Sequence, residues 1–414
     1  MIKSDYGKFN CPIYEEKLSS EMNLILIPRD SKIKTAVLYI PQGYYLHDDE
    51  INSTKINYGC PFLLKEMILN EETILKINEI SAKVTAVCEH SYTYYKFETM
   101  SSLTKAINIL LARIKDLKLT DDEVEKYKKV LMSKNKEDDI ILVNDNTVKN
   151  MFISSPMKNG SSIKNSDLKM IHLTEMKKFL YRYYSLKSLT LFVSGNISPN
   201  DCLNKLVSNL NFPIFPITSS KEKKFNEDYT RVKERRDVIS FKNDRHLLSF
   251  GIKFDKRQTL YEKFGDLIFA FYEIALDVLT NNEEFNKVLK ESDSSLVYKT
   301  ITEGYEDTFL LLTFKCDKYA TLSNRLSSYL SAIDKNITNK LFNEIKKQYI
   351  YKSTNILSSP SLLIDEFARV YADNLPYTYI MKKVSTLTYT DFMKILKTLL
   401  SYPRSVTYLE NIKD

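Results

Sequence analysis

Hydrophobic and polar residues in the first half of the chain follow two patterns: short apolar runs, and apolar residues spaced by three or four positions. Apolar runs at 24–28 and 35–40 flank a polar turn, a pattern that predicts a hairpin. A second pair of strands is predicted at 84–87 and 92–97, on either side of a polar break. Helical spacing from 58 to 69 predicts a helix between the two pairs.

The rest of this half is predicted to be mainly helical. Five apolar residues mark one amphipathic helix: Leu103, Ile107, Leu110, Leu111 and Ile114. Thr120 and Glu123 have the capping-box spacing, which predicts a helix that continues through Leu131. A further helix at 174–184 leads into a strand at 189–193.

The second half of the chain repeats this order of elements about 215 residues later. Leu173 corresponds to Leu387 and Asn196 to Asn411, which gives offsets of 214 and 215. Strands are predicted at 238–241, 247–254, 297–300, 308–314 and 405–409, with a mostly helical stretch at 258–291. A nearly constant offset over half a chain predicts two copies of one domain, not a short-period solenoid.

Strands separated by pairs of helices predict an α+β fold, in which helices pack on one face of a mostly antiparallel sheet. We expect two homologous domains at 1–212 and 238–414, joined by a linker at 213–237. Seven basic and five acidic residues lie between 219 and 237, a composition that predicts a solvated tether. A partner site in this basic stretch is the alternative.

Composition fits an ordinary globular protein. The 414 residues are enough for two domains with a core each, and the 43% of hydrophobic residues excludes a disordered chain. The net charge of +7 is spread along the sequence, so it does not predict nucleic-acid binding, although it would suit an acidic or extended peptide.

Cysteine usage and the lack of long apolar runs predict the compartment. The five cysteines are an odd number without C-x-x-C spacing, which predicts free, buried thiols in a reducing environment. The first residues lack the apolar core of a signal peptide, and no apolar run approaches 18 residues. We therefore expect a soluble, cytoplasmic protein without membrane insertion.

The doubled order of elements resembles the insulinase/pitrilysin family of zinc peptidases over nearly the whole chain. Residues 24–43 resemble the family's opening hairpin, which ends in a glycine. The strand pair at 84–87 and 92–95 resembles the pair beside the family's zinc site. The end-of-domain signature is the most specific part: Phe152 to Gly160, Ile171, Leu173, Thr174, Phe179, Tyr183, Tyr184 and Val193 to Gly195. The resemblance implies that the two domains form a half-clamshell.

The family's active-site motif is degenerate in this chain. An H-x-x-E-H helix binds zinc through two histidines one turn apart, and its glutamate is the general base. Aligned on Gly59 and Met67, the first histidine is Phe62, the base is Lys65 and the second histidine is Glu66. A lysine at the base position would also repel a metal cation. We expect no hydrolysis by this mechanism in the chain alone.

The third zinc ligand of the family is a glutamate on a later helix. The best alignment places Lys134 there and Tyr127 at the family's neighbouring glutamate, while Glu137 could supply one carboxylate but no imidazole. No two of the four histidines lie within four residues of each other, so no helical ligand pair exists. A zinc site from Glu66, His90 and Glu137 is the weaker alternative. We expect no metal or other cofactor in this chain.

Families of this kind often work as two chains that enclose an extended peptide, one with the zinc motif and one without. The resemblance implies a partner that carries H-x-x-E-H and zinc, and peptide contacts at Thr85, Ala86 and Val87. The family's second domain also supplies an arginine and a tyrosine, which match Lys290 and Tyr298 here. Lysine lacks the planar fork of arginine, and Tyr298 could instead be a half-buried strand aromatic.

Three functions compete. The leading one is a non-catalytic subunit of a heterodimeric zinc peptidase that encloses and cleaves small or leader peptides, with maturation of a modified peptide such as a bacteriocin as a setting. The alternative is a stand-alone peptide-binding or chaperone module of the same fold. An enzyme with an unrelated mechanism has the least support, because the sequence has neither a Gly-rich phosphate loop nor a serine nucleophile elbow.

Overall fold

The computed structural model describes residues 1–4, 9–18, 21–45, 48–51, 53–135, 138–216, 218, 220–222, 225–242, 245–255, 260–303, 307–371 and 375–411. Packing groups the chain into two units of three segments each. The first unit contains residues 1–135, 163–223 and 354–379, and the second contains 136–162, 224–353 and 380–414. The predicted boundaries at 212 and 238 describe the sequence repeat and stay a prediction.

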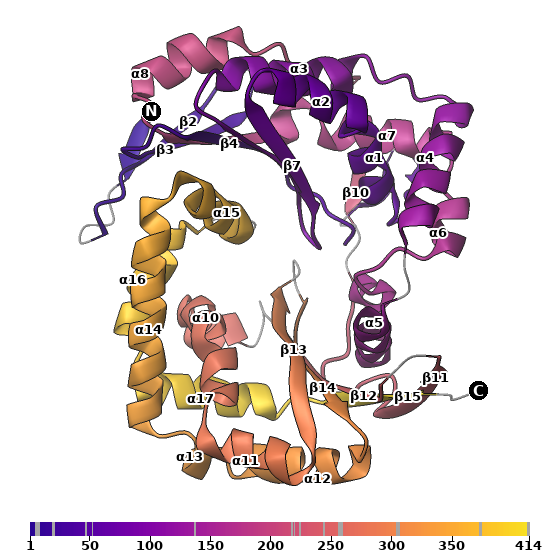
Figure 1. Ribbon diagram of the computed structural model, residues 1–414, viewed down its shortest axis with the longest axis vertical. Coiled ribbons are helices and arrows are strands. Elements are labelled where there is room, and N and C mark those ends of the chain that lie inside the picture. The colour runs from indigo at the N-terminus through magenta and orange to yellow at the C-terminus, as the bar shows by residue number, and fades with distance from the viewer. Residues whose placement is uncertain are drawn as a thin grey trace. The chain divides into compact units, whose positions relative to one another are not determined.

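The first unit is built on a seven-stranded sheet (Figure 1). Its strand order is β1 (Ile2–Ser4), β2 (Ile13–Lys17), β3 (Asn23–Pro28), β9 (Thr190–Gly195), β4 (Lys34–Ile40), β8 (Thr93–Thr99) and β7 (Ala82–Cys88). Only β3 and β9 pair in parallel among these neighbours. A small antiparallel sheet of β10 (Ser220–Glu222), β5 (Asp48–Ile51) and β6 (Thr54–Lys55) accompanies it.

The second unit has a five-stranded sheet that repeats this topology. Its order is β11 (Arg236–Phe241), β15 (Arg404–Asn411), β12 (Leu247–Asp255), β14 (Asp307–Cys316) and β13 (Ser294–Glu303). The run β3–β9–β4–β8–β7 of the first unit has the same pattern. In each run the strand that comes first in the sequence pairs in parallel with the one that comes last, β3 with β9 and β11 with β15, and the other neighbours pair antiparallel. The predicted repeat and the predicted α+β class are confirmed.

The hairpin predicted from the runs at 24–28 and 35–40 is wrong. These runs form β3 and β4, but β9 lies between them, parallel to β3 and antiparallel to β4. The sequence pattern finds both strands correctly. It cannot reveal a third strand that arrives from about 160 residues later in the chain and pairs with both. The pair β7 and β8, in contrast, is a hairpin as predicted.

Helices form a layer on one face of each sheet. In the first unit they are α1 (Cys60–Ile68), α2 (Glu71–Glu79), α3 (Leu103–Lys115), α4 (Asp121–Lys134), α6 (Asn165–Lys169) and α7 (Leu173–Tyr183), with the short α8 (Pro199–Asp201). In the second unit they are α9 (Tyr261–Phe264), α10 (Leu267–Thr280), α11 (Glu283–Glu291), α12 (Tyr319–Ser331), α13 (Ile333–Asn336) and α17 (Tyr389–Leu400). Helices α14 (Asn339–Ser358) and α16 (Tyr377–Thr386) contain residues of both units. The Thr120 hydroxyl accepts from the Glu123 N–H at 3.3 Å, as the capping-box spacing predicts.

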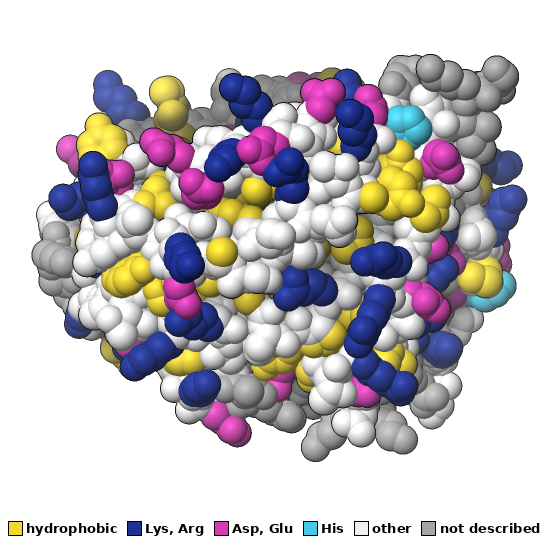
Figure 2. Space-filling model, turned by 90° about the horizontal axis from the view of Figure 1, so that it is seen from below, with side chains coloured by type: hydrophobic (Ala, Val, Ile, Leu, Met, Phe, Trp, Pro, Cys, Tyr) yellow, Lys and Arg dark blue, Asp and Glu magenta, His cyan; other side chains and the backbone are white. Residues whose placement is uncertain are grey.

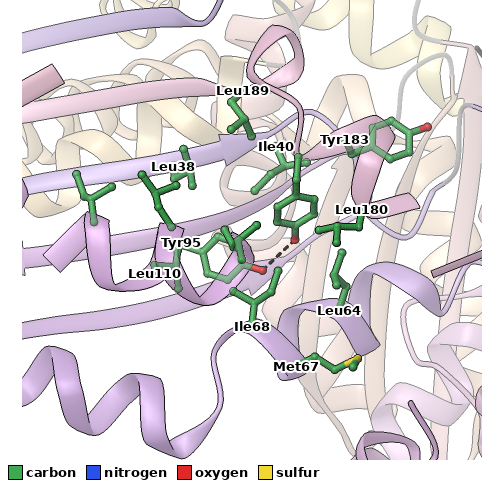
Figure 3. Packing of buried hydrophobic residues seen from close by; sticks show 14 of the residues in the cluster. Leu38, Ile40, Leu64, Met67, Ile68, Tyr95, Leu110, Leu180, Tyr183 and Leu189 are labelled. Carbon is green, nitrogen blue, oxygen red and sulfur yellow. Dashed lines mark hydrogen bonds between the residues drawn. The ribbon is translucent and has the colours of Figure 1, made fainter. Parts of the chain in front are cut away.

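The core of the first unit lies between its sheet and this layer. Figure 3 shows side chains of this cluster from β4, β8 and α1, among them Leu38, Ile40, Tyr95, Leu64 and Met67. The Tyr95 and Tyr184 hydroxyls share a hydrogen bond of 2.9 Å inside this core. The bond satisfies two phenols that would otherwise be buried without a partner.

Each sheet also carries one helix on its other face, in addition to the predicted layer. Helix α15 (Pro360–Val370), from the second sequence half, packs on β4 and β9 of the first unit. There Asp365 pairs with Lys96 of β8 at 2.6 Å. Helix α5 (Asp139–Met151), from the first half, packs on β12 and β15 of the second unit. There Asn144 accepts from the Ser249 hydroxyl at 2.9 Å. The two sequence halves have exchanged one helix each.

Part of the predicted linker is packed and not a solvated tether. The Glu227 carboxylate is buried and accepts the backbone N–H groups of Ile153, Ser154 and Ser155 at 2.7–3.1 Å. It also pairs with Lys253 of β12, whose side chain is fully buried. Composition could not predict this, because a buried carboxylate and an exposed one count equally in it.

The surface matches the diffuse charge of the sequence. Basic and acidic side chains are interspersed over the face that Figure 2 shows, with hydrophobic side chains between them. Among the described helices, none is both long and apolar enough to cross a bilayer. All five cysteines are free, and Cys88 alone is more than marginally accessible. The prediction of free thiols is confirmed.

Candidate functional site

Helix α1 has two faces with different chemistry. Proline at its start and a glycine N-cap begin the helix, and its buried face packs into the core of the first unit, as Figure 3 shows for Leu64, Met67 and Ile68. Phe62, Lys65 and Glu66 stand at i, i+3 and i+4, so they share the opposite face. Lys65 and Glu66 therefore lie at the edge of the core, while Phe62 on the same face is part-buried and still packs against it.

Three of the degenerate motif positions form an ion triad. Lys134 of α4 pairs with Glu66 Oε2 at 2.6 Å, and Lys65 lies 3.4 Å from Glu66 Oε1. The side chains of Lys65 and Glu66 are 22% and 19% exposed, while that of Lys134 is 60% exposed. The structure thus brings together three of the four positions aligned with zinc ligands and base. In this triad two ammonium groups share one carboxylate. At the four aligned positions, which include that of Phe62, the family has two imidazoles and two carboxylates.

An aromatic stack completes this face. Phe62 stacks on Tyr44, with ring centroids 5.2 Å apart and planes 16° apart, and Tyr44 in turn contacts His90 at 4.8 Å. Burial lowers the pKa of His90 to about 4, so the imidazole is neutral at pH 7. Phe62 is part-buried: it packs against the core of the first unit and its ring stacks on Tyr44.

The loop that carries Tyr44 is held tightly against the end of β7. The Tyr44 and Tyr45 N–H groups donate to the carbonyls of Glu89 and His90 at 3.1 and 2.8 Å. A Cβ on Gly43 would lie 1.8 Å from the Glu89 carbonyl oxygen, so only glycine fits there. The close approach explains why the resemblance to the family includes a glycine at this point.

Strand β7, which contains the predicted peptide contacts Thr85, Ala86 and Val87, is an edge strand. Among the described strands it pairs only with β8. The Glu89 N–H donates to the Tyr92 carbonyl, and bonded and non-bonded pairs alternate from there along an antiparallel ladder. That alternation directs the N–H and C=O of Val84, Ala86 and Cys88 to the unpaired edge. An extended peptide can bond to such an edge as an added strand.

The site is continuous from the triad to this edge. Helix α1 packs against both α4 and β7. The Phe62 ring of α1 stacks on Tyr44, and the Tyr44 N–H donates to the carbonyl of Glu89, just after β7. The ion triad, the aromatic stack and the strand edge therefore form one surface within the first unit.

The other candidate ligands do not join a metal site. Tyr127 accepts a hydrogen bond from Asn70 at 3.1 Å. His246 accepts from the Asn411 N–H in the second unit, and His172 precedes α7. Glu137 and His47 lie outside the described residues. Over the described part of the chain, no three His, Cys, Asp or Glu residues are grouped to hold a metal. The alternative site from Glu66, His90 and Glu137 includes a residue outside that part, so it stays a prediction.

Lys290 and Tyr298 belong to the second unit. Lys290 is exposed near the end of α11, and Tyr298 is 41% exposed on β13, next to a bulge in its pairing with β14. Neither residue shares a unit with Thr85, Ala86 and Val87. Their predicted contact with a partner's active site stays a prediction.

Sequence reasoning found the triad positions one by one but missed that they would bond to each other. The signal was available, because the resemblance places Lys65, Glu66 and Lys134 close together and their charges are opposite. Opposite charges at positions that converge predict an ion pair. It also missed Tyr44 as the partner of Phe62, and nothing in the local sequence points to that contact.

Solved structures that are similar to this chain include peptidases and an inactive peptidase domain. A protein assigned as an M16-like peptidase from Alicyclobacillus acidocaldarius matches at 15% identity with a TM-score of 0.80, over 97% of this chain and 99% of that one. A protease from Helicobacter pylori matches at 13% identity with a TM-score of 0.80, over 96% and 99%. A peptidase M16 inactive domain from Pseudomonas fluorescens matches at 12% identity with a TM-score of 0.71, over 97% and 98%.

The sequence itself matches no family model and no curated protein. At these identities the structural matches establish the fold alone. The chain has the insulinase/pitrilysin fold that its sequence resembles.

Proposed function

We propose that this chain is a non-catalytic subunit of a heterodimeric zinc peptidase, which holds an extended peptide while a partner with an intact H-x-x-E-H motif cleaves it. The observation that carries the proposal is the Lys65–Glu66–Lys134 triad beside the unpaired edge of β7. An unpaired strand edge, to which a peptide could bond, supports the proposal. The groups that would activate water are replaced.

The triad explains why hydrolysis needs a partner. A catalytic zinc site uses three protein ligands and an open position for water. Here the side chain at the base position is a cation, and the only carboxylate among the aligned positions is already paired with Lys134 at 2.6 Å. A divalent cation would have to displace an ammonium group and then sit beside two positive charges. We therefore expect zinc in the partner and none in this chain.

Peptide binding would use the backbone of β7. A strand added at this edge gains hydrogen bonds to main-chain groups, which are independent of peptide sequence. The aromatic stack and the ion triad would then contact the side chains on one face of the peptide. Such a subunit suits small or leader peptides that are already extended, and maturation of a modified peptide such as a bacteriocin is the setting that we propose. The free thiols favour the cytoplasm as its location.

The first test is a pull-down of the tagged chain from its native cells, with identification of partners by mass spectrometry, zinc analysis and a peptide-hydrolysis assay. A stoichiometric partner with an intact motif, and activity that a chelator removes, supports the proposal. A metal-free assembly of this chain alone that binds peptide contradicts it and supports the stand-alone binding module instead.

A proline substitution tests the role of the strand edge. Ala86→Pro removes an N–H that points to the unpaired edge, so the sheet should tolerate it, whereas peptide binding should fall about tenfold or more. Thr85→Pro is the matched control, because the same change removes a bond of the β7–β8 ladder and should destabilise the fold. Unchanged peptide affinity in a folded Ala86→Pro variant would exclude binding at this edge.

A further inference from the structure

We propose that Lys65 selects peptides with an acidic side chain, because its ammonium group receives a carboxylate from a peptide strand added to β7. This inference rests on the proposed function and specifies its substrate class. It assigns the lysine at the degenerate base position a role in specificity.

The bonds that Lys65 leaves unmade support this role. An ammonium group has three donors, and a good N–H···O bond measures about 2.7–3.2 Å. The contact from Lys65 to Glu66 is 3.4 Å, while Lys134 takes the other oxygen of the same carboxylate at 2.6 Å. Among the described residues, no other carboxylate forms an ion pair with Lys65. The Lys65 side chain is 22% exposed and its nitrogen is not among the buried polar atoms without a partner, so the ammonium group is accessible to a ligand.

The position of Lys65 determines which peptide atoms could reach it. It shares one face of α1 with Phe62, which stacks on Tyr44 in the loop bonded to the end of β7. Side chains of an added strand alternate between the two faces of the sheet. Those on the helix-covered face, near the Cys88 end of β7, would pass the Lys65 ammonium and the Phe62 ring. A short acidic side chain there could make the charge-assisted bond that Lys65 lacks.

Net charge alone does not produce this selection. Counting Lys83 of β7 and Glu89 just after it, the surface holds three lysines and two carboxylates, and so its net charge is small. Glu89 lies 3.8 Å from His90 Nδ1, and no ion pair joins it to any of these lysines within the described residues. Selection therefore depends on the placement of one under-bonded ammonium group at the strand edge.

The test is affinity selection from a degenerate ten-residue peptide library by the purified full chain, with sequencing of the captured peptides. We expect one position enriched about tenfold in Asp and Glu over Asn and Gln, the size of effect that a charge-assisted bond gives. Lys65→Met should remove the enrichment, and Lys65→Arg should keep it. Lys118→Met is the control, because Lys118 is an exposed lysine of the same unit and the charge change is identical. Lys65→Gln serves if the methionine variant does not fold.

Each outcome has one meaning. Peptides captured without acidic enrichment, or enrichment that survives in Lys65→Met, overturn the role of Lys65 and leave the proposed function standing. Capture of no peptide at all contradicts both. A second library with amidated C-termini separates the two sources of a carboxylate, because enrichment that needs a free C-terminus would assign Lys65 to the terminal carboxylate and overturn the side-chain assignment.

Discussion

Gly43 shows how one residue can fix the shape of the candidate site. The backbone of its loop touches the backbone at the end of β7, and an added Cβ would lie 1.8 Å from one carbonyl oxygen and 2.6 Å from the next. Backbone on both sides of the contact cannot move without breaking the bonds that hold Tyr44 and Tyr45. The position of Tyr44, and through it Phe62, therefore depends on a glycine.

We expect Gly43→Ala to lower the free energy of unfolding by more than about 2 kcal/mol. Ordinary overpacking costs about 1–3 kcal/mol, and the cost here should lie in the upper part of that range or above it because the backbone that the Cβ meets cannot move aside. Gly251→Ala is the comparison, because its nearest neighbour is the flexible end of Met151, at 2.7 Å. Urea denaturation of both variants measures the difference. Equal losses of unfolding free energy would mean that the loop at Gly43 adapts.

His90 should make stability depend on pH. Burial holds its pKa at about 4, below the ordinary value of 6.5, so between these values the unfolded chain binds more protons than the folded one. The contribution is complete above pH 6.5 and is lost as the pH falls towards 4, on the order of 3 kcal/mol in total. Unfolding free energies of the native chain and His90→Gln, compared at pH 7.5 and 4.5, isolate it from other titrating groups. An identical loss in both chains would contradict the buried neutral state.

At the scale of elements, local patterns predicted what local chemistry decides. Apolar spacing located α1 and α3, and the Thr120 capping box located the start of α4. The relation between β3 and β4 could not be predicted, because β9 joins them from far along the chain. Nor was α5 predicted. All nine residues of β12 are buried, but its sequence alternates apolar with polar or small residues, so the pattern indicates one covered face and does not reveal the helix on the other.

The placement of α1 against α4 yields a prediction that is independent of peptide binding. Lys134 and Glu66 meet at 2.6 Å, so ligands at these positions could share one ion. The variant Phe62→His, Lys65→Glu, Glu66→His, Lys134→Glu should restore two imidazoles and a carboxylate, and bind one zinc per chain. Zinc titration against the triple variant that keeps Lys134 provides the control, and it should bind at least about tenfold more weakly. Absence of zinc in the folded quadruple variant would show that the alignment of Lys134 is wrong.

At the scale of the whole molecule, the exchanged helices tie the two sequence halves together. In the first unit, Asp365 of α15 accepts from Lys96 and from the Tyr94 hydroxyl, at 2.6 and 3.1 Å. In the second unit, Asn144 of α5 accepts from Ser249 and Thr313, and Val143 packs against Leu247 and Leu409. Without the other half, each sheet would expose a face that carries buried polar and apolar groups.

The two sequence halves should therefore fold only together. Fragments 1–212 and 213–414, cut at the predicted domain boundary, should each be insoluble or partly folded when expressed alone, because each lacks the helix that covers its sheet. Co-expression should give a soluble one-to-one complex, measured by size-exclusion chromatography and circular dichroism.

A substitution on α15 tests whether the exchanged helix is the cause. Asp365→Asn removes the charge that pairs with the nearly buried Lys96 and should weaken the association of the fragments about tenfold or more. Glu366→Gln, next along the same helix and paired only within it to Arg369 among the described residues, should have little effect. If each fragment folds alone and melts cooperatively, the two halves are independent folding units and the exchanged helices are not required for folding. If the fragments depend on each other as expected, a peptide-holding subunit of this kind cannot be shortened to the single unit that carries the strand edge.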